Sequence, residues 1–157
     1  MYSKILVPLD GSKLAESVLP HVETLAKGCN VNEVILLRVC VPPSILSDYP
    51  ENMPRSWTEN VSKMTGHMAN QCSLYLGDIE KKLKAAGINV RTESRLGSPA
   101  NEIVDFADKN GIDLIIMASH GRSGPSRWAY GSTADKVLRS TCVPVMVVKG
   151  PGCAPGL

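Results

Sequence analysis

Four short aliphatic runs, each nearly free of polar side chains, constrain the fold of this chain more than any other feature. They occupy residues 5–7, 34–37, 114–117 and 143–148. Because they are rich in β-branched residues and do not alternate between apolar and polar, they are typical of strands buried on both faces of a parallel sheet. A weaker, alternating run at residues 88–90 predicts a fifth strand, at an edge of the same sheet.

Apolar residues recur at helical spacing in each of the gaps between these runs. The expected helices cover residues 12–26, 61–83, 98–110 and 132–138. Ser12 and Ser132 are the expected N-caps of the first and last helices. Pro20 is expected to bend the first helix because it lacks a backbone donor, and Gly111 is expected to end the third.

Strands that alternate with helices predict βαβ units. Right-handed crossovers then favour one doubly wound α/β domain over residues 1–149, with helices on both faces of a five-stranded parallel sheet in the order 3-2-1-4-5. A long loop is expected over residues 40–57, and a flexible tail rich in glycine and proline over residues 150–157.

Composition excludes several function classes. Aromatic residues make up 4% of the chain and its net charge is +2, which argues against nucleic-acid binding. No apolar run approaches the roughly 18 residues of a membrane span. Five widely spaced cysteines do not suggest a disulfide framework. We therefore expect a cytoplasmic protein with reduced thiols, in which Cys40 and Cys142 are buried beside strands.

Ligands of doubly wound sheets bind beyond the carboxyl ends of the strands, where the strand order reverses. Here that point lies between the first and fourth strands. The first strand is followed by Asp10, and the fourth by a glycine-rich segment that reaches Gly131, Ser132 and Thr133 at a helix start. Such a segment lets backbone N–H groups approach phosphate. Neither the P-loop motif nor the GxGxxG fingerprint is present, so the site is expected to take a nucleotide or phosphate in another way.

Two segments of the sequence resemble the universal stress protein family. Residues 4–12 (KILVPLDGS) resemble the family's opening, and residues 117–133 together with 143–148 resemble its C-terminal signature. ATP-binding members carry G-x-x-G, nine residues, and then G-[S/T]. Gly121, residues 122–130 and Gly131-Ser132 match this pattern, whereas Ala118 stands in place of the first glycine.

This resemblance implies a Rossmann-like or flavodoxin-like domain that binds ATP, ADP or AMP, with Mg²⁺ accompanying a triphosphate. In it, Asp10 would hold the ribose hydroxyls. The adenine would be framed by Pro8, Leu9 and the backbone of Val39. The phosphates would be surrounded by Gly121, Arg122, Ser123, Gly131, Ser132 and Thr133. Met117, Ala118 and His120 complete the expected binding site. No catalytic residue and no protein cage for a metal is expected.

The resemblance also implies a homodimer formed through the last strand, which starts at Val143 and ends at Val148. An uncovered apolar edge strand is an aggregation hazard, so pairing it has a physical reason. A further, unidentified protein partner is compatible with the same sequence.

Several alternatives remain open. Asp10 could only cap the first helix, and the glycines could only permit a tight loop. The favoured function is an ATP-binding regulatory dimer of the stress response. A slow ATPase would have only His120 and Asp10 as candidate bases. A nucleotide-free dimeric interaction protein is favoured by Ala118 alone, and a flavin electron carrier is the most distant alternative.

Overall fold

Five parallel strands form the central sheet of the computed structural model, which describes residues 2–42, 54–120 and 130–150. The strand order is β3-β2-β1-β4-β5, so the predicted fold class and strand order are confirmed. The strands are β1 (Lys4–Pro8), β2 (Glu33–Cys40), β3 (Val90–Leu96), β4 (Leu114–Ala118) and β5 (Val145–Val148). In the register of the sheet, Ile5 on β1 lies between Val34 on β2 and Leu114 on β4.

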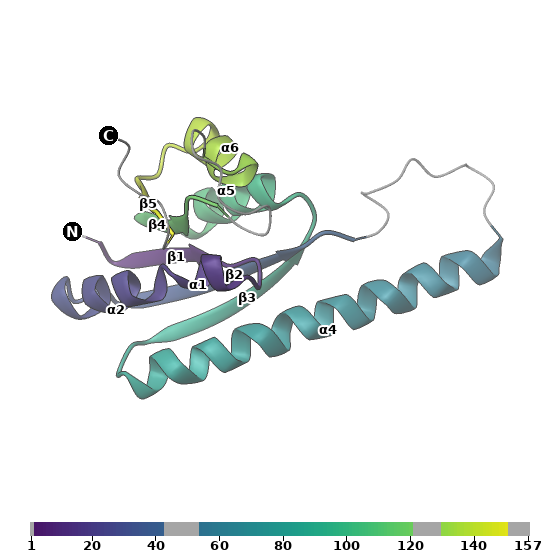
Figure 1. Ribbon diagram of the computed structural model, residues 1–157, viewed down its shortest axis with the longest axis horizontal. Coiled ribbons are helices and arrows are strands. Elements are labelled where there is room, and N and C mark those ends of the chain that lie inside the picture. The colour runs from purple at the N-terminus through teal and green to yellow at the C-terminus, as the bar shows by residue number, and fades with distance from the viewer. Residues whose placement is uncertain (1, 43–53, 121–129, 151–157) are drawn as a thin grey trace.

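Helices cover both faces of this sheet, as Figure 1 shows. They are α1 (Lys13–Glu16), α2 (Leu19–Gly28), α4 (Arg55–Ala85), α5 (Pro99–Asn110) and α6 (Ser132–Ser140). One hydrophobic core lies between the sheet and α1, α2 and α4. A second core lies between the sheet and α5 and α6. Successive strand side chains enter opposite cores, which explains why the aliphatic runs are uninterrupted.

The first predicted helix is divided into two. α1 ends at Glu16, and α2 begins at Leu19 with Pro20 in its first turn. Proline fits a first turn because the backbone N–H it lacks would have no partner inside the helix. The expectation of one helix bent at Pro20 is therefore wrong. The Ser12 cap is confirmed, since its hydroxyl accepts a hydrogen bond from the backbone N–H of Ala15 at 3.1 Å.

Other boundaries also differ from expectation. Ser132 is the first residue of α6 and Gly131 is its N-cap, so the predicted Ser132 cap is wrong by one position. The third strand is an edge strand as predicted, but it begins only at Val90 and continues to Leu96. α4 already begins at Arg55, inside the expected loop.

Some expectations fall outside the described residues. The middle of the expected loop, residues 43–53, and residues 151–157 of the expected tail are among them, as are Gly121, Arg122 and Ser123. The boundary of the domain at residue 149 remains a prediction. Across the described ranges, no helix combines the length and apolar character that crossing a membrane requires.

Candidate functional site

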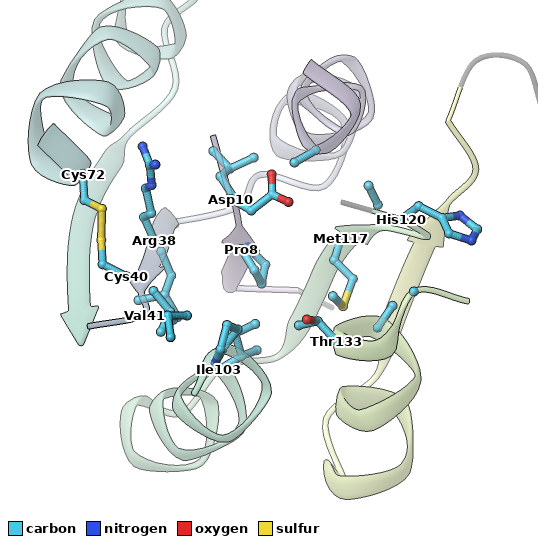
Figure 2. A pocket seen from close by; sticks show the side chains of 18 of the residues that line it. Pro8, Asp10, Arg38, Cys40, Val41, Cys72, Ile103, Met117, His120 and Thr133 are labelled. Carbon is cyan, nitrogen blue, oxygen red and sulfur yellow. A yellow bond between two sulfur atoms is a disulfide. The ribbon is translucent and has the colours of Figure 1, made fainter. Parts of the chain in front are cut away.

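A cavity of about 670 Å³ opens at the carboxyl ends of the strands, beside β1 and β4. This is the point where the strand order reverses, and the volume is typical of small-molecule sites. Figure 2 shows its walls coming from the ends of the strands and from the surrounding helices. The cavity therefore has the position that the sequence predicts for a ligand.

Ten of the thirteen predicted binding residues line this cavity. They are Pro8, Leu9, Asp10, Val39, Met117, Ala118, His120, Gly131, Ser132 and Thr133. Segments more than a hundred residues apart in sequence are thus brought to one place. The roles of these residues toward a ligand remain predictions, because the cavity shows only that they line the same space.

Asp10 takes part in the turn that starts α1. Its Oδ1 atom accepts hydrogen bonds from the backbone N–H of Ser12 at 2.9 Å and from the Ser12 hydroxyl at 2.6 Å. The same hydroxyl accepts from the N–H of Ala15, so the Asp10 carboxylate orients the residue that caps the helix. Because Asp10 also lines the cavity (Figure 2), this turn is compatible with a ligand contact.

The end of β4 and the start of α6 form the opposite wall. The Gly131 N–H donates to the Ser119 carbonyl at 2.7 Å, and the Ser119 N–H donates to the Val148 carbonyl at 2.8 Å. These bonds fix the first turn of α6 against the sheet. Within the described ranges, no side-chain oxygen caps that turn, and helix N–H groups without an internal partner are suited to binding anions. Ser132 and Thr133 lie beside them on the wall.

His120 is buried, with 8% of its surface exposed. Its Nδ1 atom lies 3.1 Å from the Ser119 hydroxyl. In Figure 2 the imidazole ring is directed away from the other labelled side chains of the cavity. This orientation favours a structural role for the ring over a role as general base.

Arg38 is a cavity residue that the sequence reasoning missed. Its guanidinium carbon lies 4.7 Å from the centre of the Tyr75 ring. It also packs against Gly11 (φ +87°), where an added Cβ would approach the guanidinium to 2.9 Å. Even-numbered residues of β2 such as Val34 and Leu36 enter the core beneath α4. The same alternation could have placed the Arg38 side chain on that face, at the mouth of the site.

Tyr75 connects Arg38 to the first helix. Its hydroxyl donates to the Glu16 carboxylate at 3.1 Å. Burial raises the pKa of Tyr75 above its ordinary value, and the charge of Glu16 raises it further. The phenol therefore stays protonated and remains a donor, which holds α4 and α1 together beside the cavity.

Two cysteines of the cavity wall form a disulfide that was not expected. It joins Cys40, at the end of β2, to Cys72 on α4. The expectation of reduced thiols throughout is wrong for this pair. Cys142, expected to be buried, is exposed. The 31 residues between Cys40 and Cys72 gave no spacing signal, because only the fold brings them together.

No cluster of three or more metal-binding side chains occurs in the described parts of the chain. Asp10 supplies the carboxylate among the described residues that line the cavity. If Mg²⁺ accompanies a triphosphate here, the phosphate oxygens and water would supply most of its ligands, as is usual for this ion.

Comparison with known sequences identifies one family. A sequence model of the universal stress protein family matches residues 1–149. Two relatives from Methanocaldococcus jannaschii are each 33% identical to the chain. The alignment with universal stress protein MJ0531 covers 96% of this chain and 84% of the relative. The alignment with universal stress protein MJ0577 covers 95% of this chain and 96% of the relative.

Comparison with solved structures agrees with this result. The structure of the hypothetical protein MJ0577 superposes with a TM-score of 0.82 at 32% identity, and the match covers 97% of this chain and 99% of that one. A universal stress protein solved in complex with cAMP superposes with a TM-score of 0.60 at 19% identity, covering 95% and 98%. At that identity the second likeness concerns the fold alone.

Proposed function

Since the chain belongs to the universal stress protein family, we propose that it binds an adenine nucleotide, ATP above all, and acts as a nucleotide-dependent regulatory protein in the stress response. One observation carries the proposal. The residues after β1, the end of β2 and the start of α6 all line this one cavity. Together these segments would hold the adenine, the ribose and the phosphates.

The two ends of the cavity differ in chemistry in the way a nucleotide requires. Pro8, Leu9 and Val39 line the cavity and would give an apolar surface to an adenine ring, to which the Val39 backbone would offer hydrogen bonds. The first turn of α6, with Ser132 and Thr133, lines the part of the cavity where the phosphates would lie. Asp10 lines the cavity as well and would accept hydrogen bonds from the ribose hydroxyls.

One universal stress protein of the same fold has a ligand that contains adenine. That universal stress protein was solved in complex with cAMP, which shares its adenosine with ATP. We further propose that the protein acts in the cytoplasm, as a homodimer paired through β5. In this role binding is its activity, and hydrolysis is at most slow.

Isothermal titration of Mg·ATP into protein stripped of nucleotide tests the proposal. We expect a dissociation constant of about micromolar order for the native chain. Gly131→Val places a branched side chain at the phosphate end and is expected to abolish the heat. Gly28→Val is the matched control, since Gly28 lies outside the cavity with nothing within 4 Å of an added Cβ. No heat and no thermal shift at roughly millimolar ATP would overturn nucleotide binding.

Ala118 favours the second candidate, a nucleotide-free interaction protein. Its methyl group lines the cavity, where ATP-binding members of the family have a glycine, and it is only 8% exposed. Titration of Ala118→Gly separates the two candidates. If ATP binds to this variant and not to the native chain, the methyl group excludes the nucleotide and the second candidate is correct.

A further inference from the structure

The disulfide between Cys40 and Cys72 lies in the wall of the cavity. Cys40 is the last residue of β2, Cys72 lies on α4, and their Cα atoms are 6.9 Å apart. Both residues line the cavity, although only 4% and 3% of their surfaces are exposed. Figure 2 shows the bond closing the side of the cavity formed by α4. Any change in this bond therefore acts directly on the cavity.

Cys72 marks the point where α4 leaves the protein core. The buried residues of α4 are Cys72, Leu76, Ile79 and Leu83. Every residue of the helix before Cys72 is exposed or half-buried, and Figure 1 shows this part extending beyond the sheet. Met68 and Gln71, within about one turn of Cys72, also belong to the cavity wall. Toward its N-terminus, α4 is thus held to the core only as far as the disulfide, and Met68 and Gln71 lie just beyond this point.

The fold itself does not depend on the bond. Leu76, Ile79 and Leu83 hold the rest of α4 in a large apolar core, and a chain of 157 residues buries enough surface to fold without cross-links. Removing the bond should therefore loosen the helix before Cys72 and leave the remainder folded. Few buried contacts and exposed backbone are what make a segment open locally.

We propose that Cys40 and Cys72 form a reversible thiol–disulfide site that sets how tightly the cavity holds its ligand. The disulfide form keeps the α4 wall, with Met68 and Gln71, in its binding position. The dithiol form lets this wall move, so ligand binding must first order it. With respect to the ligand, this inference rests on the proposed nucleotide binding.

The bond forms by exchange with a low-molecular-weight disulfide. The thiolate of one cysteine attacks that disulfide, forms a mixed disulfide and releases one small thiolate. The second cysteine, as thiolate, then attacks the protein sulfur of the mixed disulfide and expels the other small thiolate. Two protons pass from the protein thiols to the two released thiolates. The small disulfide gains the two electrons that the cysteine pair loses, and it reaches the pair through the cavity that both residues line.

Thermodynamic linkage gives this site a second, reciprocal property. If the disulfide form binds ATP more tightly, bound ATP must shift the thiol–disulfide equilibrium toward the disulfide by the same factor. ATP added to the protein in a glutathione buffer of fixed ratio should therefore raise the disulfide fraction.

The test compares the full chain equilibrated with oxidised glutathione and the full chain reduced with dithiothreitol. Alkylation and peptide mass mapping identify which cysteines are bonded, and Mg·ATP is titrated into each form. We expect the reduced form to bind about fivefold more weakly or worse. Cys72→Ala should behave like the reduced form in both buffers. Cys29→Ser, which removes a free cysteine outside the cavity, should respond as the native chain does.

Equal affinity in the two forms, or failure of glutathione to join Cys40 to Cys72, would overturn the inference while leaving nucleotide binding intact. If neither form binds ATP, the proposed function fails. Amide hydrogen exchange over residues 55–71 then decides the inference alone. Faster exchange in the reduced form supports control of the α4 wall, and identical exchange overturns it.

Discussion

At the scale of single residues, Asp10 has an observed role in the cap of α1 and a proposed role toward the ligand, and substitution can separate them. Its carboxylate orients Ser12 in the cap of α1 and also lines the cavity. Asp10→Asn keeps an oxygen to accept from Ser12 but removes the charge that would bind ribose hydroxyls. We expect ATP affinity to fall about tenfold in a calorimetric titration, with little change in thermal stability.

Ser12→Ala is the matched variant for this experiment. It removes the side-chain acceptor of the Ala15 N–H, so it should lower the free energy of unfolding by ~1 kcal/mol and leave ATP affinity unchanged. If Asp10→Asn lowers stability in the same way and does not weaken binding, Asp10 serves the helix cap alone.

Asp113 is expected to make the stability of the fold depend on pH. Its Oδ2 atom accepts hydrogen bonds from the backbone N–H groups of Ser3 and Lys4, both at 2.8 Å. These bonds hold the pKa of Asp113 below its ordinary value of 3.8. A lowered folded-state pKa stabilises the fold above the unfolded-state pKa, and this contribution is lost as pH falls through the folded-state value.

Asp113→Asn should therefore lower the free energy of unfolding by about 1 kcal/mol at neutral pH. The difference between the variant and the native chain should shrink below the ordinary pKa and vanish below the lowered one. Urea unfolding of both proteins over a pH series measures it. A difference that stays constant with pH would contradict this account.

At the scale of elements, the sequence predicted those helices, strands and caps that depend on a local pattern of residues. Uninterrupted aliphatic runs identified β1, β2 and β4 because these strands are buried on both faces, and the Ser12 cap followed from the residues beside it. Features that arise from packing were missed. Arg38 reaches the cavity because β2 ends beneath α4, and Cys40 meets Cys72 for the same reason. The contact between Cys40 and Cys72 leaves no signal in the local sequence, whereas the alternation along β2 does give one for Arg38.

Misplaced boundaries have a different physical cause. The helical spacing of apolar residues continues across Pro20, so the pattern could not show that the helix is interrupted between α1 and α2. At α6, Ser132 and Gly131 are both acceptable N-caps by residue type. The bond from the Gly131 N–H to Ser119 decides between them, and it depends on where β4 ends.

The long helix α4 tolerates a glycine that costs it stability. Gly77 lies in its interior, and an added Cβ there would meet nothing within 4 Å. Gly77→Ala should therefore raise the free energy of unfolding by ~1 kcal/mol, because alanine loses less backbone entropy in a helix. Gly87, just after the helix, has equal space but a φ of +81°. Gly87→Ala should lower stability in the same urea experiment, and a gain there would contradict the argument.

At the scale of the whole molecule, the two edges of the sheet are unlike. The β3 edge carries Arg91, Glu93 and Arg95, and Arg91 pairs with Glu93 and with Glu33. The β5 edge consists of VMVV with no charge. Charged side chains on an edge strand disfavour pairing with another chain, whereas an uncharged apolar edge strand favours it. The asymmetry favours β5 as the edge that pairs in the proposed homodimer.

Backbone geometry identifies the residue through which to test this pairing. The carbonyls of Pro144 and Val148 accept hydrogen bonds from the N–H groups of Ile115 on β4 and of Ser119 just after it. Because neighbours along a strand alternate in the direction of their backbone groups, Val147 directs its N–H toward the open edge. Val147→Pro removes that donor without breaking the ladder to β4, and the dimer dissociation constant should rise about tenfold or more in sedimentation equilibrium.

The opposite edge of the sheet provides the control. There the Gly97 N–H donates to the Cys40 carbonyl, so Ser94 presents its N–H outward by the same alternation. Ser94→Pro should leave the dimer intact, and a dimer that survives Val147→Pro or dissociates with Ser94→Pro would exclude β5 as the interface.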